Sequence, residues 1–240
     1  MNLRAMTFNI QHCEDFINGG VCPELTANTI RAFNPDFCVL NEVYGLGDGS
    51  CPPEYGNQTA VIAELAQMDY HAFCPAITIY GKPYGNAIVS KRPILSCKTV
   101  PIPEPLPHGY PEAYYENRCV LVADMGEYLV MGSHFGLAPD EQENAVKTVL
   151  SEVEKAEKPV ILCGDFNMTP DNKTLAPIFD KLYDTSKAME NPKLSFPSDK
   201  PEIKIDYIFV SSRFSVKNAD IPGVMASDHR PYIADLCLEI

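Results

Sequence analysis

Basic residues are scarce in this sequence. Only 19 Lys and Arg stand against 32 Asp and Glu, so the 240 residues carry a net charge of −13. Proteins that grip a nucleic-acid backbone regardless of its sequence do so through Lys and Arg, so this balance argues against a general nucleic-acid binder. A local basic groove remains compatible with it, and a bound divalent cation would offset part of the acidic charge.

Long apolar runs and a secretion leader are also absent. No run approaches the length that spans a membrane. The chain starts with MNLRAM and continues directly into a strand-like run, without a basic and then apolar leader. We therefore expect a cytoplasmic protein with no membrane-spanning segment.

The nine cysteines include no C-x-x-C pair and no Cys/His spacing typical of a zinc site. Several of them, such as Cys38, Cys163 and Cys237, lie in apolar strand-like runs. We therefore expect reduced, buried cysteines. Three others lie in loop-like sequence and are the candidates for an exception: Cys13, Cys22 and Cys51.

What is present is a regular succession of short elements. Without an internal repeat, a low-complexity segment or a linker, the sequence predicts one domain over residues 1–240. Amphipathic periodicity predicts helices at 23–33, 59–68, 139–155 and, after a turn, within 170–182. Apolar or alternating runs predict strands at 3–10, 37–40, 71–80, 84–91, 94–100, 118–124, 128–133, 160–163, 204–210, 214–219 and 232–238.

The connections add to this outline. Short turns join 71–80 to 84–91 and 84–91 to 94–100, which favours antiparallel neighbours. We expect 214–219 to be the hairpin partner of 204–210. The segments 44–57 and 101–116 are expected to be loops, and the second, rich in Pro and Tyr, is a candidate substrate wall. The pattern predicts two packed sheets with helices outside.

The stretch V-I-L-C-G-D-F-N at 160–167 is the centre of the functional prediction. A buried strand ends here in Asp165 and Asn167, whose side chains point the same way because side chains alternate along a strand. Ligand sites in layered α/β proteins lie beyond strand ends of this kind. Taken alone, the two residues also suit an ordinary turn that caps the next helix.

Other polar residues follow apolar strands in the same manner: Asn9, Glu42, His134, Asp206, Asp228 and His229. Each alone has a structural alternative, such as a turn former, a satisfied core histidine or a solvated loop. Their repetition favours a shared site. Glutamate with amide and carboxylate neighbours suits Mg²⁺, and histidines near carboxylates suit phosphate contact and proton transfer. The set predicts metal-assisted attack of water on a phosphoester.

Seven motifs occur in order along nearly the whole chain. They are T-F-N-I at Asn9, L-N-E-V at Glu42, Y-G-N-A-I-V-S at 84–90, S-H-F-G-L at His134, G-D-F-N at Asp165, I-D-Y-I-F at Asp206 and S-D-H-R-P at Asp228. Together they resemble the endonuclease/exonuclease/phosphatase superfamily. The resemblance implies an α/β four-layer sandwich of two packed mixed β-sheets with helices on the outer faces. It also implies phosphoester hydrolysis with Mg²⁺ or Mn²⁺.

The resemblance further implies a role for each matching residue. Glu42 would be the metal ligand with Asn9 beside it, and Asp165 would orient or deprotonate the attacking water. Asn167 and His134 would bind phosphate oxygens.

His229 would transfer a proton or bind phosphate, oriented by Asp228, and Asp206 would hold a partner histidine, His134. Asn86 and Arg118 are assigned to substrate binding. Asn41 stands where the family usually has glutamine, and the tyrosine of abasic-site enzymes has no assignable counterpart.

Substrate is left open by these motifs, because family members share chemistry and differ in their loops. The first possibility is a phosphoesterase acting on a small or lipid-like monoester or diester. The second is a nuclease acting on DNA or RNA, which the scarcity of basic residues disfavours. A non-catalytic binding module is the third. The number of metals and the oligomeric state also stay open.

Overall fold

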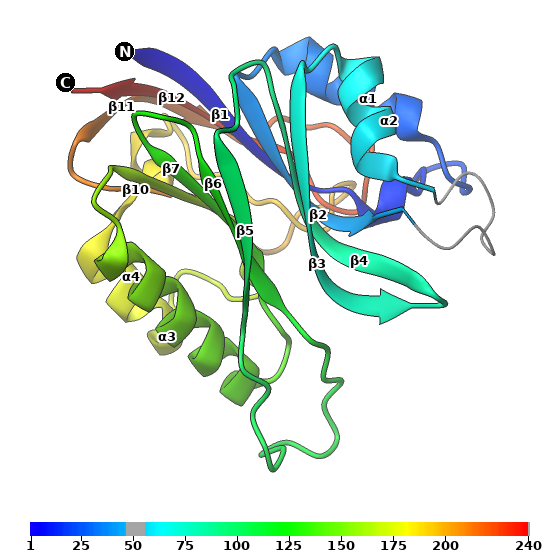
Figure 1. Cartoon of the computed structure of the whole chain (residues 1–240), viewed down its shortest axis with the longest axis vertical. Helices are drawn as coiled ribbons and strands as arrows, with labels where there is room; N and C mark the ends of the chain where they lie inside the picture. Colours follow the sequence, from blue (N-terminus) through cyan, green and yellow to red (C-terminus); the bar gives the residue numbers. More distant parts are fainter. Residues whose placement is uncertain (47–55, 240) are drawn as a thin grey trace.

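Figure 1 shows the computed structural model, in which two β-sheets pack against each other and helices cover their outer faces. The structure describes residues 1–46 and 56–239. The middle of the loop predicted at 44–57, with Cys51, lies outside the described residues. The four-layer α/β sandwich predicted from the sequence is confirmed.

Six strands form the first sheet, in the order β11-β12-β1-β2-β4-β3. Their bounds are β1 Asn2–Asn9, β2 Phe37–Tyr44, β3 Tyr70–Ile79, β4 Lys82–Ser90, β11 Phe214–Asp220 and β12 Tyr232–Leu238. Six more form the second sheet, in the order β5-β6-β7-β8-β10-β9. Their bounds are β5 Ser96–Pro101, β6 Cys119–Asp124, β7 Leu129–His134, β8 Val160–Asp165, β9 Tyr183–Asp184 and β10 Asp206–Val210.

Two expected strand pairings are wrong. β11 pairs with β12 in the first sheet, whereas β10 pairs with β8 and β9 in the second, so 214–219 is not the partner of 204–210. The short turn after β4 leads to β5 in the other sheet, although β3 and β4 are antiparallel neighbours as predicted. A turn can pass the chain between stacked sheets as easily as fold it back within one, and local sequence does not distinguish the two.

Helices α1 (Pro23–Phe33) and α2 (Gln58–Ala66) cover the first sheet, and α3 (Pro139–Lys155) and α4 (Ala176–Lys181) cover the second. Three buried clusters hold the four layers together. The cluster between the sheets includes Val39 and Ile161. The other two lie under the helices, with Ile30 of α1 in one and Val149 of α3 in the other. Burial of these apolar side chains is the main favourable term in folding.

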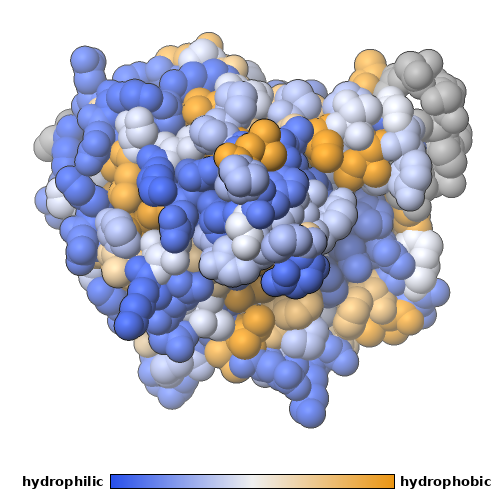
Figure 2. All heavy atoms as spheres, turned by 90° about the horizontal axis from the view of Figure 1, so that it is seen from below, coloured by the Kyte–Doolittle hydropathy of each residue, from blue (hydrophilic) through white to orange (hydrophobic). Residues whose placement is uncertain are grey.

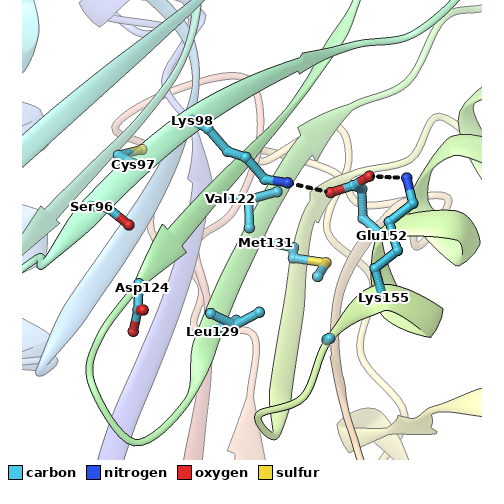
Figure 3. A pocket seen from close by; sticks show the side chains of 10 residues that line it. Ser96, Cys97, Lys98, Val122, Asp124, Leu129, Met131, Glu152 and Lys155 are labelled. Carbon is cyan, nitrogen blue, oxygen red and sulfur yellow. Dashed lines mark hydrogen bonds and ion pairs between the residues drawn. The ribbon is translucent and has the colours of Figure 1, made fainter.

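The C-terminal end of α3 is tied to β5 by an ion-pair bridge. Lys98 on β5 and Lys155 on α3 each place their amine 2.7 Å from the Glu152 carboxylate, and Figure 3 shows this bridge beside a pocket with an apolar floor. Within the described residues, no helix combines the length and the apolar character needed to cross a membrane.

Candidate active site

Strand direction brings the predicted polar residues to one end of the sandwich. β1 and β2 are parallel, with Asn9 beside Asn41, and β7 and β8 are parallel, with His134 beside Asp165. Parallel neighbours finish at the same edge of a sheet, so their terminal side chains gather there. β10 is antiparallel to β8, which places its first residue, Asp206, opposite Asp165.

Gly164 allows β7 and β8 to approach closely just before the site. Its φ of +143° is a conformation that residues with a side chain rarely adopt, and a Cβ built there would lie 1.9 Å from the Ser133 carbonyl oxygen. Because the next residue on each strand is a site residue, His134 or Asp165, this glycine helps to set the spacing between them.

Glu42 is placed by a bulge rather than by a strand end. The pairing of β2 with β4 shifts between Leu40 and Val43, and Glu42 has a left-handed φ of 61°. A bulge of this kind re-aims a side chain, which here turns the carboxylate toward the site. Tyr84 donates its hydroxyl to Glu42 Oε2 at 2.8 Å. The sequence prediction missed this tyrosine, although it lies in the Y-G-N-A-I-V-S motif.

Asn9 links two carboxylates. Its amide nitrogen donates to Glu42 Oε1 at 2.9 Å and to Asp165 Oδ2 at 3.1 Å, and its oxygen accepts the Gln11 backbone N–H at 3.1 Å. Asn9 therefore presents its N–H groups to the carboxylates. With its oxygen engaged by Gln11, Asn9 positions Glu42 and Asp165, and its expected place beside a metal held by Glu42 stays a prediction.

Two imidazoles approach the same carboxylate oxygen. His134 Nε2 and His229 Nε2 each lie 3.5 Å from Asp165 Oδ2. All three side chains are at most 10% exposed. Residues from three separate motifs thus converge on one buried oxygen at the end of β8.

The carboxylate behind His229 is Asp206. His229 Nδ1 and Asp206 Oδ2 are 2.9 Å apart, whereas Asp228 accepts a hydrogen bond from the Ser227 hydroxyl at 3.0 Å. Neither the expected pairing of Asp206 with His134 nor the orientation of His229 by Asp228 matches this arrangement. β10 begins beside β8, and the loop before β12 places His229 at the same end of the sheet. The imidazole therefore contacts Asp206, the first residue of β10.

His134 is held from the other side by Arg118. The Arg118 guanidinium lies 3.0 Å from His134 Nδ1. Since arginine can only donate, Nδ1 is the acceptor and the ring proton lies on Nε2, facing Asp165. Asn167 Nδ2 donates to the Phe135 carbonyl at 3.0 Å and lies 3.1 Å from the same Nε2. Asn167 has a left-handed φ of 50°, which folds its side chain back over the strand end.

Asn86 lies between the two sheets, beneath these groups. It accepts from Asn41 Nδ2 at 2.7 Å and donates to the Cys119 carbonyl at 3.0 Å, and Asn41 Oδ1 accepts the Asp165 backbone N–H at 3.1 Å. Asn86 and Asn41 therefore bridge the two sheets beneath the site. Asn41, the residue that departs from the family's usual glutamine, is fully buried in this bridge.

A small pocket opens beside Glu42. Its lining comes from both sheets: Glu42, Ala76, Tyr84, Gly85, Asn86, Glu116, Arg118, Cys119 and His134. Glu116 was not predicted. Its side chain is 9% exposed, and one carboxylate oxygen lies 3.4 Å from Arg118. Its position at the end of the Pro- and Tyr-rich loop, two residues before Arg118, was the one available indication.

Burial and neighbouring charges set the protonation of the site. Burial lowers the pKa of His229, but the Asp206 and Asp165 carboxylates outweigh it and raise that pKa to about 10. Burial raises the pKa of Asp165, while His229 acts in the opposite direction. The pKa of His134 falls well below its usual value through burial and the nearby Arg118. The site thus pairs a charged imidazole with a neutral one.

The described side chains include one cluster that could hold a divalent cation. Asp165, Asp206 and His229 each offer an atom, and these atoms lie within 4.8 Å of one another. Asp206 Oδ1 is buried and has no hydrogen-bond partner among residues 1–46 and 56–239. Glu42, the metal ligand that the resemblance implies, lies half-buried at the pocket. Hard cations such as Mg²⁺ prefer carboxylate oxygens of this kind and retain several waters.

A family model described as the Endonuclease/Exonuclease/phosphatase family matches residues 6–229. No curated protein sequence matches the chain. The endonuclease/exonuclease/phosphatase structure from Beutenbergia cavernae is 26% identical with a TM-score of 0.82, over 99% of this chain and 72% of that one.

Two further similar structures come from Bacteroides. A family member from Bacteroides vulgatus has 20% identity and a TM-score of 0.78, over 100% of both chains. The mannosyl-6-phosphatase Bt3783 from Bacteroides thetaiotaomicron has 18% identity and a TM-score of 0.74, over 98% of this chain and 100% of that one. At these identities the two structures show a shared fold.

Proposed function

The chain belongs to the endonuclease/exonuclease/phosphatase family, and from that premise we propose that it is a divalent-metal-dependent hydrolase of small, polar phosphate esters. Members of this family are generally hydrolases of phosphoester bonds. The observation that carries the proposal is the convergence of His134 and His229 on one oxygen of Asp165, each imidazole being held by a further charged residue.

In this proposal each side chain has a role that its contacts permit. Asp165 holds the attacking water and accepts its proton, because burial makes it a stronger base than an exposed carboxylate. His229, charged and fixed by Asp206, faces the phosphate or the leaving oxygen. His134 and Arg118 present N–H groups to the phosphate oxygens, with Asn167 beside them.

Mg²⁺ or Mn²⁺, when bound, would neutralise charge on the phosphate oxygens and polarise the phosphoester. Glu42 would be its principal ligand, because its carboxylate faces the pocket and is held by Asn9 and Tyr84. The Asp165–Asp206–His229 cluster is the alternative position. The contact of His229 Nδ1 with Asp206 Oδ2 favours Glu42, since it already engages two of the three side chains of that cluster with each other, although Asp206 Oδ1 has no partner among the described residues.

Charge favours a small substrate over a nucleic acid. A nuclease needs many Lys and Arg contacts along the backbone, and this chain has a net charge of −13. The wall of the pocket beside Glu42 adds a second carboxylate, Glu116, which is half-buried next to Arg118. A carboxylate there would repel a second phosphate, but it would accept hydrogen bonds from hydroxyl groups of the leaving group.

A lipid substrate is disfavoured by the surface. Figure 2 shows the face toward which the loop between β5 and β6 projects, and on it hydrophobic residues form separate patches divided by hydrophilic ones. A continuous apolar face would be expected for docking on acyl chains. Sugar phosphates suit the polar wall, and a mannosyl-6-phosphatase has the same fold.

The proposal is tested by a screen of sugar phosphates, aryl phosphates, phosphodiesters, RNA and DNA with Mg²⁺ or Mn²⁺. We expect turnover of a small phosphate ester and its loss, by about 10²–10⁴-fold, in Asp165→Asn. Asp180→Asn, an exposed carboxylate on α4, makes the same change of charge and should retain activity. Faster cleavage of nucleic acid than of every small ester would overturn the substrate assignment.

A further inference from the structure

Two cysteines from different sheets lie in contact at one side of the sandwich. Cys74 on β3 and Cys97 on β5 have their sulfur atoms 3.5 Å apart. β3 is the last strand of the first sheet and β5 the first strand of the second, and the two strands run side by side in Figure 1. Both cysteines are free thiols in the structure.

The local geometry aims both thiols at the space between the sheets. Figure 3 shows Lys98, the next residue on β5, reaching outward to Glu152 on α3. Side chains alternate along a strand, so Cys97 faces the opposite way and packs against the core between the sheets. Cys74 belongs to that same core.

We propose that Cys74 and Cys97 are an oxidation site that forms a disulfide between the two sheets. The sulfurs need to move closer by about 1.5 Å to reach disulfide bonding distance, a shift within the play of two side chains on edge strands. Cys97 is half-buried, so a small oxidant has access to the pair, whereas Cys74 is 2% exposed.

The third nearby thiol is turned elsewhere. Cys119 on β6 directs its sulfur toward the Cys74 carbonyl oxygen at 3.7 Å, and Asn86 Nδ2 lies 3.6 Å from that sulfur. Cys119 is therefore engaged by backbone and amide groups, whereas Cys74 and Cys97 face each other directly. This geometry selects the pair Cys74–Cys97 over either pairing with Cys119.

The chemistry balances with hydrogen peroxide as the oxidant. The Cys97 sulfur contacts Cys74 and lowers the pKa of its thiol, an effect that burial opposes and Thr99 reinforces. The Cys74 thiolate attacks peroxide, which breaks the O–O bond and gives a sulfenic acid and hydroxide. The Cys97 sulfur then attacks the Cys74 sulfur and expels the sulfenic oxygen as water. The Cys97 proton leaves with the sulfenic oxygen in that water, and the proton that Cys74 lost on ionisation neutralises the hydroxide, so two thiols and one peroxide give one disulfide and two waters.

The disulfide would act on the end of the fold that carries the pocket beside Glu42. Cys74 pairs across the strands with Asn86, and Ala76, two residues further along β3, lines that pocket. Closing the loop of 23 residues restricts the unfolded chain, so we expect the oxidised protein to melt about 5–10 °C higher than the reduced protein.

The test treats the intact protein with hydrogen peroxide under non-denaturing conditions, followed by intact mass, peptide mapping without reduction, and thermal melting. We expect a loss of about 2 Da from two hydrogens, a crosslink localised by fragmentation to Cys74 and Cys97, and the higher melting temperature. Cys97→Ser should abolish all three changes. Cys237→Ser, which removes another half-buried strand cysteine, should leave them intact.

Mapping of the unmodified chain needs no variant, so the proposal stays testable if Cys97→Ser does not fold. A crosslink that joins Cys74 to Cys119, oxidation to sulfinic or sulfonic acid without a crosslink, or no change in mass would each overturn the proposal. A Cys74–Cys97 crosslink that lowers the melting temperature would overturn the claim that this disulfide stabilises the fold by linking the two sheets.

Discussion

Replacing Gly164 by alanine probes how closely the two central strands of the second sheet must approach. The added Cβ would lie 1.9 Å from the Ser133 carbonyl oxygen, and the backbone φ of +143° would have to be held by a residue that rarely adopts it. The neighbouring atom belongs to the backbone, so no side-chain rotation relieves the contact. β7 and β8 must separate, or the end of β8 must rotate.

The expected loss of stability in Gly164→Ala is the sum of two contributions, the backbone strain and the steric contact. An unfavourable backbone conformation costs about 1–3 kcal/mol, and an overpacked contact costs about 1–3 kcal/mol more. A loss of about 2–6 kcal/mol lowers the melting temperature of a chain of this size by roughly 5–20 °C. Separation of the strands would also displace His134 from Asp165, and a misplacement of about 1 Å can cost about 10²-fold in rate.

Gly126→Ala is the matched control. Gly126 also has a positive φ, +91°, but a Cβ there would meet only Leu95 Cδ1 at 3.8 Å. Calorimetric unfolding and steady-state turnover of both variants separate strain from clash. We expect Gly126→Ala to lose about 1–3 kcal/mol and keep its turnover. Equal melting temperatures of the two variants, with full turnover in Gly164→Ala, would refute the reasoning.

Four further substitutions test individual contacts. Asp206→Asn should lower kcat by about 10²–10⁴-fold, because it removes the charge that contacts His229. Asp228→Asn should lower kcat less, because Asp228 contacts Ser227 instead, and equal losses in steady-state kinetics would contradict this assignment. Glu116→Gln should lower kcat/KM for a hexose phosphate by about 10-fold or more but leave para-nitrophenyl phosphate little changed, and a parallel loss on both would instead make Glu116 a positioning residue for Arg118. Tyr84→Phe should weaken Mg²⁺ binding by about 10-fold in a calorimetric titration, because Glu42 loses a hydrogen bond. An unchanged affinity would show that Tyr84 has no part in metal binding.

The layers of the fold, and the gathering of the site residues at strand ends, could be predicted from the sequence. The apolar run at 160–163 predicts a strand shortly before Asp165, and the structure extends that strand to Asp165 itself. Helices at Pro23–Phe33 and Pro139–Lys155 have the predicted bounds, because proline at the first turn and a clear apolar stripe mark them locally. These features depend on neighbours within a few residues.

Contacts between residues far apart in the sequence could not be predicted in the same way. The contact of His229 with Asp206 joins a loop to the start of β10, and nothing in either motif distinguishes His229 from His134 as the partner. The pairing of β11 with β12 and the contact of Cys74 with Cys97 also depend on which strands become neighbours. Glu42 was expected just past a strand end, but a bulge within β2 places it, and local sequence carries no clear mark of that bulge.

The most direct test of a metal-dependent hydrolase centred on Glu42 is turnover of a small phosphate ester as a function of free Mg²⁺, measured for the wild type and for Glu42→Gln. The account predicts that chelation abolishes wild-type turnover and that Mg²⁺ restores it. It also predicts that Glu42→Gln, which keeps the shape of the side chain but loses its charge, stays inactive at Mg²⁺ concentrations that saturate the wild type. Full turnover in the presence of chelator, or a Glu42→Gln enzyme with the wild-type Mg²⁺ dependence, would contradict it.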